Sequence, residues 1–289
     1  MKFEKAVRKK ARLRLGLTGP SGSGKTWSAL ELATGIGGPI AVIDTEHESA
    51  SLYSDRFDFD TLNLAAPYSP ERFIEAIRAA EKAGYKTLII DSLTHEWSGP
   101  GGCLEINDML ASARYKGNTW SAWSETTPRH RALLDVIIAS PMHIILTLRS
   151  KTETVQGEGK KVMKLGLKSE MRDGFEYELT TVLDIGHESH AATASKDRTG
   201  LFTGRDPFQI TAETGKALMQ WLDAGAALPP LPDDRFAKAI GLIREGKATP
   251  GSVTANFTLT DGQQEQLDGL LSELAHAASQ KQIEQEQDA

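Results

Sequence analysis

The chain has 289 residues, a net charge of −6 at pH 7 and a single cysteine, Cys103. This length is enough for one large domain or two smaller ones. The acidic net charge is unlike that of a constitutively basic nucleic-acid binder. A single cysteine excludes an internal disulfide and a four-cysteine metal site. No apolar stretch approaches the roughly 18 residues that a membrane span requires, so we expect a soluble cytoplasmic protein with no membrane partner.

The chain begins with a basic arm over residues 1–12, in which six lysines and arginines stand against one glutamate. From residue 13 to residue 206, apolar segments alternate with segments of helical periodicity. This alternation predicts an α/β fold whose mostly parallel sheet is flanked by helices. Trp120 and Trp123 have helical spacing and are predicted to face a core. The expected strands lie at 13–19, 39–45, 61–64, 86–92 and 143–149, the helices at 26–36, 69–84 and 129–140, and a hairpin at 177–185 with 190–195.

The character of the sequence changes after residue 206. Residues 207–232 are predicted to be a linker because of the prolines in AALPPLPDD. Residues 233–279 then form a small helical C-terminal unit, in which Thr260 and Gln263 have the spacing of a capping box. The polar composition of residues 280–289 predicts a disordered tail.

The segment GPSGSGKT, residues 19–26, matches the phosphate-binding pattern G-x-x-x-x-G-K-[ST] between a predicted strand and a predicted helix. Backbone N–H groups of such a loop and the N-terminus of the next helix bind phosphates. The expected cofactors are therefore ATP and Mg²⁺, with Lys25 at the β- and γ-phosphates and Thr26 as a metal ligand. The residues predicted to bind the nucleotide in this loop are Gly19, Pro20, Ser21, Gly22, Ser23, Gly24, Lys25 and Thr26.

Acidic residues at the ends of two predicted strands supply the other groups that an ATPase needs. Asp91 ends KTLIIDS, the Walker B position, and is the second predicted metal residue. The residue after it is Ser92 and not the glutamate of many ATPases, so the group that activates water must come from elsewhere. Glu46 in AVIDTEHES is the preferred catalytic candidate, since it lies just past a strand end where ligands bind in open α/β sheets. Asp44 and Glu48 are its competitors.

Together these segments resemble the RecA-like recombinase ATPases over about residues 13–206. VIDTEHE is similar to the family segment that carries the catalytic glutamate, at Glu46, and LIIDS is similar to the Walker B strand, at Asp91. HIILTLRS stands where the family strand ends in a polar sensor, often glutamine. Here the matching residue is Thr147, followed by Arg149. Within this class, the chain looks most like the phage-encoded RecA-like ATPases found beside single-strand annealing proteins.

The resemblance also implies contacts outside the nucleotide site. In SKDRTGLF, Lys196 and Arg198 match a basic pair that reaches the ATP of a neighbouring subunit and would stabilise charge on the γ-phosphate. In the family, a loop after the sensor strand binds single-stranded DNA, and the matching region is 150–174. A solvated basic turn or hairpin is the alternative for both segments. The basic residues of the region 150–174 are Lys151, Lys160, Lys161, Lys164, Lys168 and Arg172.

The preferred hypothesis is a DNA-dependent ATPase that binds single-stranded DNA and assists phage-type recombination or strand annealing. Its expected partners are further copies of the chain, in a ring or filament with ATP at the subunit interfaces, and an annealing or single-strand binding protein. A non-catalytic adaptor gated by ATP and a P-loop kinase for a small metabolite are the alternatives. The kinase predicts a phosphorylated product and a functional monomer. The adaptor predicts slow turnover that Glu46→Gln leaves unchanged.

Overall fold

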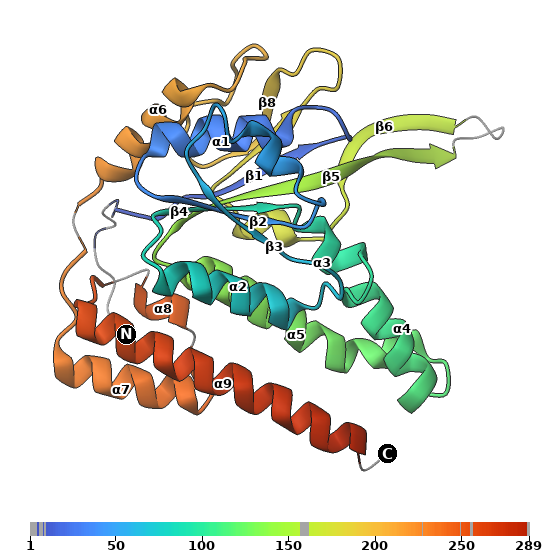
Figure 1. Ribbon diagram of the computed structural model, residues 1–289, viewed down its shortest axis with the longest axis vertical. Coiled ribbons are helices and arrows are strands. Elements are labelled where there is room, and N and C mark those ends of the chain that lie inside the picture. Colours follow the sequence, from blue (N-terminus) through green and yellow to red (C-terminus); the bar gives the residue numbers. More distant parts are fainter. Residues whose placement is uncertain are drawn as a thin grey trace.

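A computed structural model describes residues 5, 8, 10–156, 162–226, 228–248, 250–254 and 257–287. Its centre is one sheet with the strand order β3-β2-β4-β5-β1-β7-β8 (Figure 1). All pairs in this order are parallel except β7 with β8, and β6 pairs with β5 in an antiparallel hairpin. The strands are β1 (Arg14–Gly19), β2 (Ile40–Asp44), β3 (Asp60–Asn63), β4 (Thr87–Asp91), β5 (His143–Gln156), β6 (Val162–Ser169), β7 (Thr181–Ile185) and β8 (Ala192–Asp197).

Helices cover both faces of this sheet, with α1 and α6 on one face and α2 and α5 on the other (Figure 1). The α/β fold with a mostly parallel sheet, which the sequence predicts, is therefore confirmed. The helices of the described residues are α1 (Lys25–Ile36), α2 (Pro70–Lys82), α3 (Thr94–Ser98), α4 (Cys103–Arg114), α5 (Thr119–Ala139), α6 (Ala212–Asp223), α7 (Asp233–Arg244), α8 (Pro250–Thr254) and α9 (Asp261–Gln287), with short 3₁₀ turns at Ser49–Tyr53 and Phe175–Glu178.

The central strands supply two separate cores because their side chains alternate between the two faces. Ile43 of β2 and Ile90 of β4 pack in the core beneath α2 and α5. Their neighbours Val42 and Ile89 pack in the other core, against α1. A parallel strand that is buried on both faces needs a continuous apolar sequence. This requirement makes β2, β4 and the first half of β5 easy to recognise in the sequence.

Residues 207–232 differ from the linker that the prolines predict, because helix α6 occupies the middle of this stretch. Leu218 and Leu222 of α6 are buried in the same core as α1. The described part of the basic arm also lies here, since the N–H of Lys10 donates to the carbonyl of Ala226 at 2.9 Å. The layer on this face of the sheet therefore includes residues beyond 206.

Helices α1 and α6 touch through two glycines. A Cβ atom at Gly215 would lie 2.3 Å from the carbonyl oxygen of Leu32 and 2.9 Å from the Cα of Gly35. A Cβ atom at Gly35 would lie 1.9 Å from the carbonyl oxygen of Ala212. These are backbone atoms that cannot move aside cheaply, so only glycine permits this approach of the two helices.

Two further segments on the other face differ from the sequence-based expectation. Helix α5 starts at Thr119, well before the expected residue 129, and continues through Pro128, with the Asn118 side chain accepting from the N–H of Ser121 at its N-cap. The prediction that both tryptophans face a core is wrong for Trp120, which is 86% exposed. Trp123 is half-buried and stacks on Trp97 at 5.5 Å between ring centroids.

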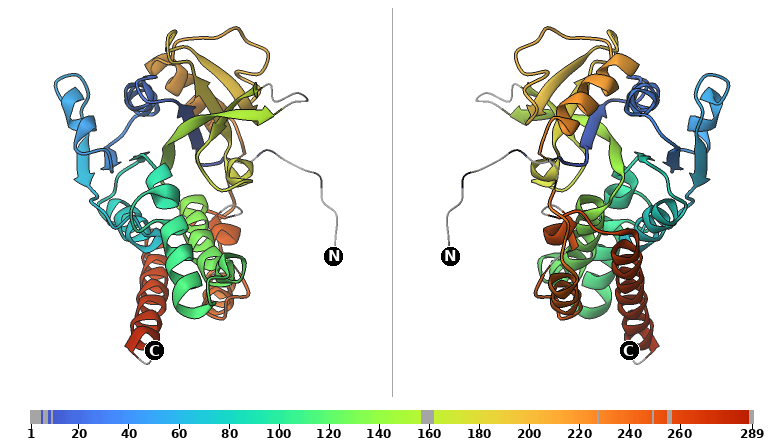
Figure 2. Two further views of the ribbon diagram at one scale, coloured as in Figure 1. Left: turned by 90° about the vertical axis from the view of Figure 1, so that its right-hand side faces the viewer. Right: turned by 90° about the vertical axis from the view of Figure 1, so that its left-hand side faces the viewer.

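The helices after α6 surround a small core of their own, which includes Phe236 and Leu267. The predicted capping box is confirmed: the N–H of Gln263 donates to Thr260 Oγ1 at 3.3 Å and the N–H of Thr260 donates to Gln263 Oε1 at 3.1 Å. Helix α9 lies beside the helices of the main domain (Figure 2). It continues to Gln287, into the stretch that the sequence predicts to be a disordered tail.

The glycine contact between α1 and α6 generates a stability prediction. Gly215→Ala is expected to lower the free energy of unfolding by about 1–3 kcal/mol, because the added methyl group overpacks a contact between two backbones. Urea unfolding followed by circular dichroism measures this change.

Gly241→Ala is the matched control, since Gly241 also lies within a helix but a methyl group added there would meet no atom within 4 Å. Its expected effect is stabilisation of up to about 1 kcal/mol, because alanine restricts the unfolded chain more than glycine does. Equal effects of the two substitutions would contradict a close approach of α1 and α6.

Candidate nucleotide site

The segment between β1 and α1 forms a tight loop at the edge of the sheet where the parallel strands end. Gly22 and Gly24 have φ angles of 77° and 91°, in the left-handed region that glycine adopts without strain. A Cβ atom at Gly19 would lie 2.4 Å from Ser23 Oγ and 2.9 Å from the carbonyl oxygen of Ile185. The loop is therefore built from close backbone approaches that residues with a Cβ atom would not permit.

Lys25, the first residue of α1, folds back over this loop. Its Nζ donates to the carbonyl oxygens of Gly19 at 3.0 Å and Pro20 at 2.9 Å, and the residue is only 9% exposed. Burial lowers the pKa of the Lys25 ammonium, whereas the negative charges of Asp91 and Glu46 raise it. A buried ammonium held by neutral carbonyls is suited to exchange them for phosphate oxygens.

Three oxygen-bearing side chains converge next to Lys25, from three different elements. Asp91 at the end of β4 accepts a hydrogen bond from Thr26 Oγ1 at Oδ2 and one from Thr147 Oγ1 at Oδ1, both at 2.5 Å. Burial raises the pKa of Asp91, and the hydrogen bonds from Thr147 and Thr26 lower it. Carboxylate and hydroxyl oxygens beside a phosphate site are the ligand types that Mg²⁺ uses, so Thr26 and Asp91 fit this ion.

The three acidic residues at the end of β2 and just after it have different partners. Asp44 is buried, and its carboxylate accepts from the N–H groups of Glu46 at 2.6 Å and Ala50 at 2.9 Å. Glu48 Oε1 accepts from Asn63 Nδ2 at 2.8 Å. Glu46 Oε1 instead accepts from Arg149, from Nε at 3.1 Å and Nη2 at 2.9 Å. Two of the three carboxylates therefore hold local structure, and that of Glu46 binds Arg149 in the middle of β5.

The turn between β7 and β8 lies against the phosphate-binding loop, a contact that the sequence analysis missed. His190 Nδ1 is 3.0 Å from the carbonyl oxygen of Ser23. Because β7 runs parallel to β1, the turn that follows it must lie at the same edge, and this is the signal that could have revealed it. A cavity of about 330 Å³ beside the loop is lined by Gly24, Trp27, Ser28, His190, Gln209 and Ile210.

A family model described as "AAA domain" matches residues 11–211, more than two thirds of the chain. The chain belongs to the AAA domain family. This is a family of P-loop ATPase type, which implies nucleotide binding, and the loop at residues 19–26 carries the sequence pattern expected of such a site. The match alone names neither a recombination activity nor a nucleic-acid ligand. No curated protein matches the chain.

Lys196 and Arg198 do not reach the nucleotide loop of their own AAA domain. Strand β8 runs antiparallel to β7 and pairs its end, Asp197, with the start of β7. The two cations therefore lie at the sheet edge opposite the loop. Lys196 Nζ donates to the carbonyls of Glu176 at 2.6 Å and Tyr177 at 2.7 Å, and Arg198 Nη2 donates to that of Tyr177 at 2.8 Å.

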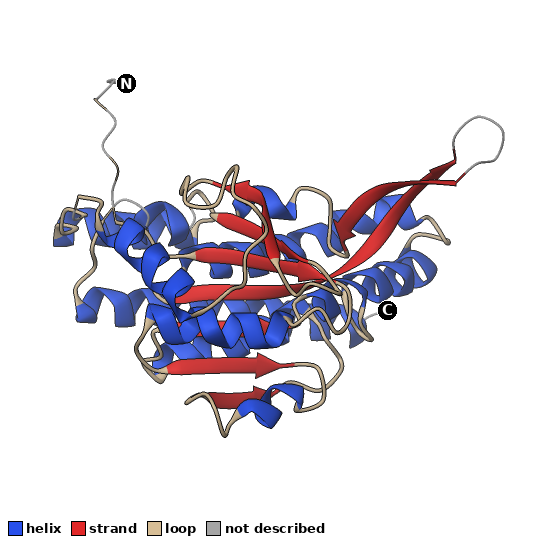
Figure 3. Ribbon diagram, turned by 90° about the horizontal axis from the view of Figure 1, so that it is seen from above, coloured by secondary structure: helices blue, strands red, loops and turns tan. Residues whose placement is uncertain are grey.

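The region 150–174 is not the loop that the resemblance implies, because most of its described residues belong to β5 and β6 (Figure 3). These strands extend beyond the rest of the sheet in Figure 3. Lys168 is exposed and pairs with Asp173 at 2.8 Å, and the Arg172 guanidinium lies 5.4 Å from the ring centroid of Trp123. Among the other predicted contacts, Lys151 lies on β5 and Lys164 on β6, whereas Lys160 and Lys161 lie outside the described residues.

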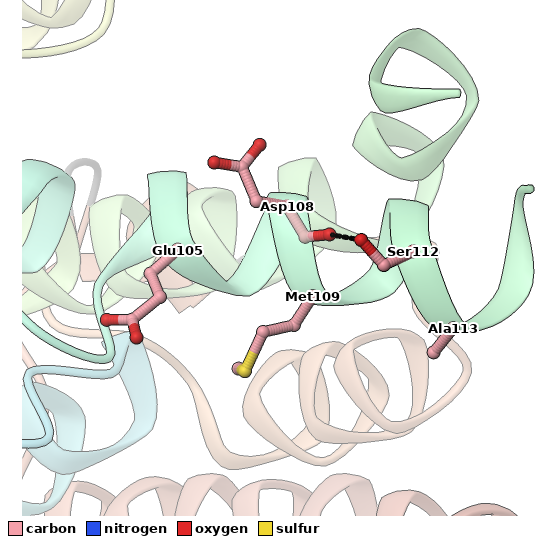
Figure 4. A pocket seen from close by; sticks show the side chains of 5 residues that line it. All are labelled: Glu105, Asp108, Met109, Ser112 and Ala113. Carbon is pink, nitrogen blue, oxygen red and sulfur yellow. Dashed lines mark hydrogen bonds between the residues drawn. The ribbon is translucent and has the colours of Figure 1, made fainter. Parts of the chain in front are cut away.

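A wider hollow of about 580 Å³ lies on the exposed side of α4 (Figure 4). Glu105, Asp108, Met109, Ser112 and Ala113 line it, all from one helix. It contains two carboxylates and no group that would bind a phosphate, so its volume does not make it the nucleotide site. No helix among the described residues of this AAA domain is both long and apolar enough to cross a membrane.

The contact between Thr147 and Asp91 generates a prediction about metal-dependent binding. Thr147→Val removes a hydrogen bond that lowers the pKa of Asp91, and leaves a buried carboxylate less available to Mg²⁺. We expect ATP affinity in the presence of Mg²⁺ to fall by up to about ten-fold, with affinity in EDTA unchanged. Titration with a fluorescent ATP analogue measures both.

Thr126→Val is the matched control, because Thr126 is equally buried and its hydroxyl donates to Asn107 within the helical layer. It is expected to leave both affinities unchanged. An equal loss with and without Mg²⁺ in Thr147→Val would mean that this residue supports the loop and not the carboxylate of Asp91.

Proposed function

We propose that this protein is a RecA-like ATPase that binds single-stranded DNA, hydrolyses Mg-ATP and assists phage-type recombination or strand annealing in the cytoplasm of a bacterial host. One observation carries the proposal. The phosphate-binding loop, Asp91 and Glu46 lie at or just after the ends of three strands, β1, β4 and β2, which end at the same edge of a parallel sheet. A phosphate, a metal-binding carboxylate and a carboxylate able to accept a proton from water can therefore meet there.

Each residue of the site has a distinct role in this proposal. Lys25 exchanges the carbonyls of Gly19 and Pro20 for phosphate oxygens, while the loop N–H groups bind the rest of the triphosphate. Thr26 and Asp91 hold Mg²⁺, which when bound neutralises part of the phosphate charge. Glu46 accepts the proton of the attacking water, a contribution of about 10²–10⁴-fold in rate for a general base.

The positions of Lys196 and Arg198 support a site shared between subunits. Both cations lie across the sheet from their own loop, so they can act only on the ATP of a neighbouring copy. A cation supplied in this way stabilises charge on the transferred phosphate by about 10³–10⁵-fold. Turnover would then depend on assembly into a ring or filament.

The β5–β6 hairpin supports the nucleic-acid part of the proposal. It extends outward from β5 (Figure 3), whose inner half lies between the strands that carry the phosphate loop and Asp91. Its lysines are a local basic segment in a chain whose net charge is −6. Such a segment contacts phosphates without reading sequence. An annealing or single-strand binding protein is the expected partner on the same strand.

The function predicts the response of ATP hydrolysis to single-stranded DNA. At fixed salt, an oligonucleotide is expected to raise kcat of the wild type. Glu46→Gln is expected to lower kcat by about 10²–10⁴-fold, since it removes the proton acceptor, with ATP affinity unchanged. A coupled assay for phosphate release measures this rate.

Glu48→Gln is the control, because Glu48 is two residues away and its carboxylate binds Asn63; its turnover is expected to equal that of the wild type. Turnover that Glu46→Gln leaves unchanged would favour an ATP-gated adaptor. A phosphorylated small molecule, with no response to DNA, would favour a kinase.

The shared site predicts complementation between two inactive variants. Lys25→Ala removes the nucleotide contact but keeps the basic pair. The double substitution Lys196→Ala with Arg198→Ala removes the basic pair but keeps the nucleotide contact. In an equal mixture, about one interface in four combines an intact loop with an intact basic pair. We expect about a quarter of the wild-type rate, measured by phosphate release after subunit exchange. A mixture as inactive as its components would contradict a contribution from the neighbouring subunit.

A further inference from the structure

The single cysteine of the chain lies in a buried cluster with a glutamate and a histidine, none of which belongs to the nucleotide site described above. Glu96 comes from α3, Cys103 is the first residue of α4, and His130 comes from α5. The three residues are 0%, 0% and 2% exposed, and one possible ligand atom from each lies within 4.8 Å of the other two. Three neighbouring helices (Figure 1) therefore each contribute one metal-binding side chain to the same buried place.

The glycine-rich turn at residues 98–102 places the thiol of Cys103 against the carboxylate of Glu96. A Cβ atom at Gly102 would lie 2.7 Å from the carbonyl oxygens of both His95 and Glu96. Only glycine permits this approach of the turn to the backbone of α3. As a result Cys103 Sγ donates to Glu96 Oε1 at 3.0 Å, although the two residues are seven apart in the sequence.

Hydrogen bonds between α4 and α5 bring the imidazole of His130 to the same place. Asn107 Oδ1 accepts from Thr126 Oγ1 at 3.2 Å, and Asn107 Nδ2 donates to the carbonyl of Thr119 at 3.1 Å. Asn107 lies one turn after Cys103 on α4, and Thr126 lies one turn before His130 on α5. Residues four apart share one face of a helix, so the contact between Asn107 and Thr126 sets Cys103 and His130 opposite each other.

The spacing of the donor atoms suits a small divalent ion. His130 Nδ1 lies 3.0 and 3.2 Å from the two carboxylate oxygens of Glu96, and Cys103 Sγ lies 3.0 Å from one of them. A tetrahedral zinc ion with bonds of about 2.0–2.3 Å places neighbouring ligand atoms about 3.3–3.6 Å apart. The side chains therefore need to separate by only about half an ångström to admit the ion. Both carboxylate oxygens, the sulfur and the imidazole nitrogen together offer four donor atoms.

The charges and the chemistry of the cluster also suit zinc. A carboxylate that is buried to this degree is costly unless it is paired or coordinates a metal. The carboxylate of Glu96 and a thiolate at Cys103 together balance the two positive charges of the ion, with the imidazole neutral. Thiolate and imidazole ligands select zinc, whereas Mg²⁺ prefers oxygen ligands. This cluster is therefore distinct in kind from the pair Thr26 and Asp91.

A hydrogen-bonded network without an ion is the alternative. Burial and the negative charge of Glu96 raise the pKa of the Cys103 thiol, so in this network the thiol keeps its proton. The imidazole then has the same carboxylate as its partner, and His130 Nε2 is buried with no hydrogen-bond partner among the described residues. An unpartnered buried polar atom costs stability, and the free energy of metal binding offsets such a cost.

We propose that Glu96, Cys103 and His130 form a zinc site that holds α3, α4 and α5 together. On binding, the thiol proton leaves to solvent and the thiolate takes its place as a ligand. The imidazole binds through Nδ1 and keeps its one proton on Nε2. The role is structural, so the inference does not rest on the proposed function and its test needs no measurement of ATP hydrolysis.

The first test measures metal in the untagged full-length protein, purified from cells grown with added zinc and passed through gel filtration in excess Mg²⁺. We expect about one zinc ion per chain by elemental analysis. Protein from cells grown with cobalt in place of zinc is expected to show a thiolate-to-cobalt charge-transfer band in the near ultraviolet. Because Cys103 is the only cysteine, no other residue of the chain can give this band.

Substitution of the ligands tests the site in a second way. Cys103→Ser and His130→Gln are each expected to weaken zinc binding by at least about 100-fold, since losing even an outer partner of a ligand costs about 10–100-fold. Competition with a chromogenic chelator measures this affinity. The Tm of the zinc-loaded wild type is expected to exceed that of the EDTA-treated protein by about 5–10 °C, with no such difference in the two variants.

Thr126→Val is the matched control, because Thr126 is buried one turn from His130 and bonds across to α4 but supplies no ligand. It is expected to keep about one zinc ion per chain. A wild type without bound zinc would overturn the site, and so would bound cobalt without the thiolate band. Full zinc affinity in Cys103→Ser would place the ion elsewhere and overturn it too. If Cys103→Ser does not fold, the cobalt spectrum of the wild type decides alone.

Discussion

The parallel register of the central strands is the constraint on which the rest of the site depends. Gly19 pairs with Arg149 and Asp44 pairs with Asp91, so the ends of β1, β2 and β4 lie along one edge with Arg149, in the middle of β5. A shift of one residue in any pair would turn the polar residue at that strand end to the other face of the sheet. The two apolar cores oppose such a shift, because each strand has specific residues buried on each face. Packing of the sheet therefore fixes the geometry of the site.

The sequence predicts the parts whose physical requirements are local. Buried parallel strands need unbroken apolar runs, and the phosphate loop needs glycines at fixed spacing, so both can be recognised without a structure. Helix α6 is not predicted in this way, because Gly215 interrupts the apolar residues of its buried face. The close contact with α1 requires this glycine, and the local sequence does not show that contact. The contact between Arg149 and Glu46 joins residues far apart in the chain, and no spacing rule relates them. Exposure of Trp120 likewise depends on tertiary packing, which helical periodicity alone does not determine.

The proposed shared site divides its charges between the two ends of the sheet. The groups near the loop are a buried lysine and carboxylates, whereas Lys196 and Arg198 extend from the opposite edge and bind carbonyls of the segment 176–177. A chain with cations at one edge of its sheet and the phosphate-binding loop at the other suits head-to-tail association, in which each interface joins two different patches. In the proposed assembly, no copy would hold a complete site by itself.

The glycine contact between α1 and α6 bears on where the AAA domain ends. The family match stops at residue 211, immediately before α6 begins at Ala212. Yet α6 packs backbone to backbone on the helix that opens with Lys25, and Leu218 and Leu222 cover the same apolar core. A fragment cut at the family boundary would leave this face of α1 open to water. The smallest piece that retains the covered core therefore extends at least to Asp223, and the family pattern and the physical domain have different ends.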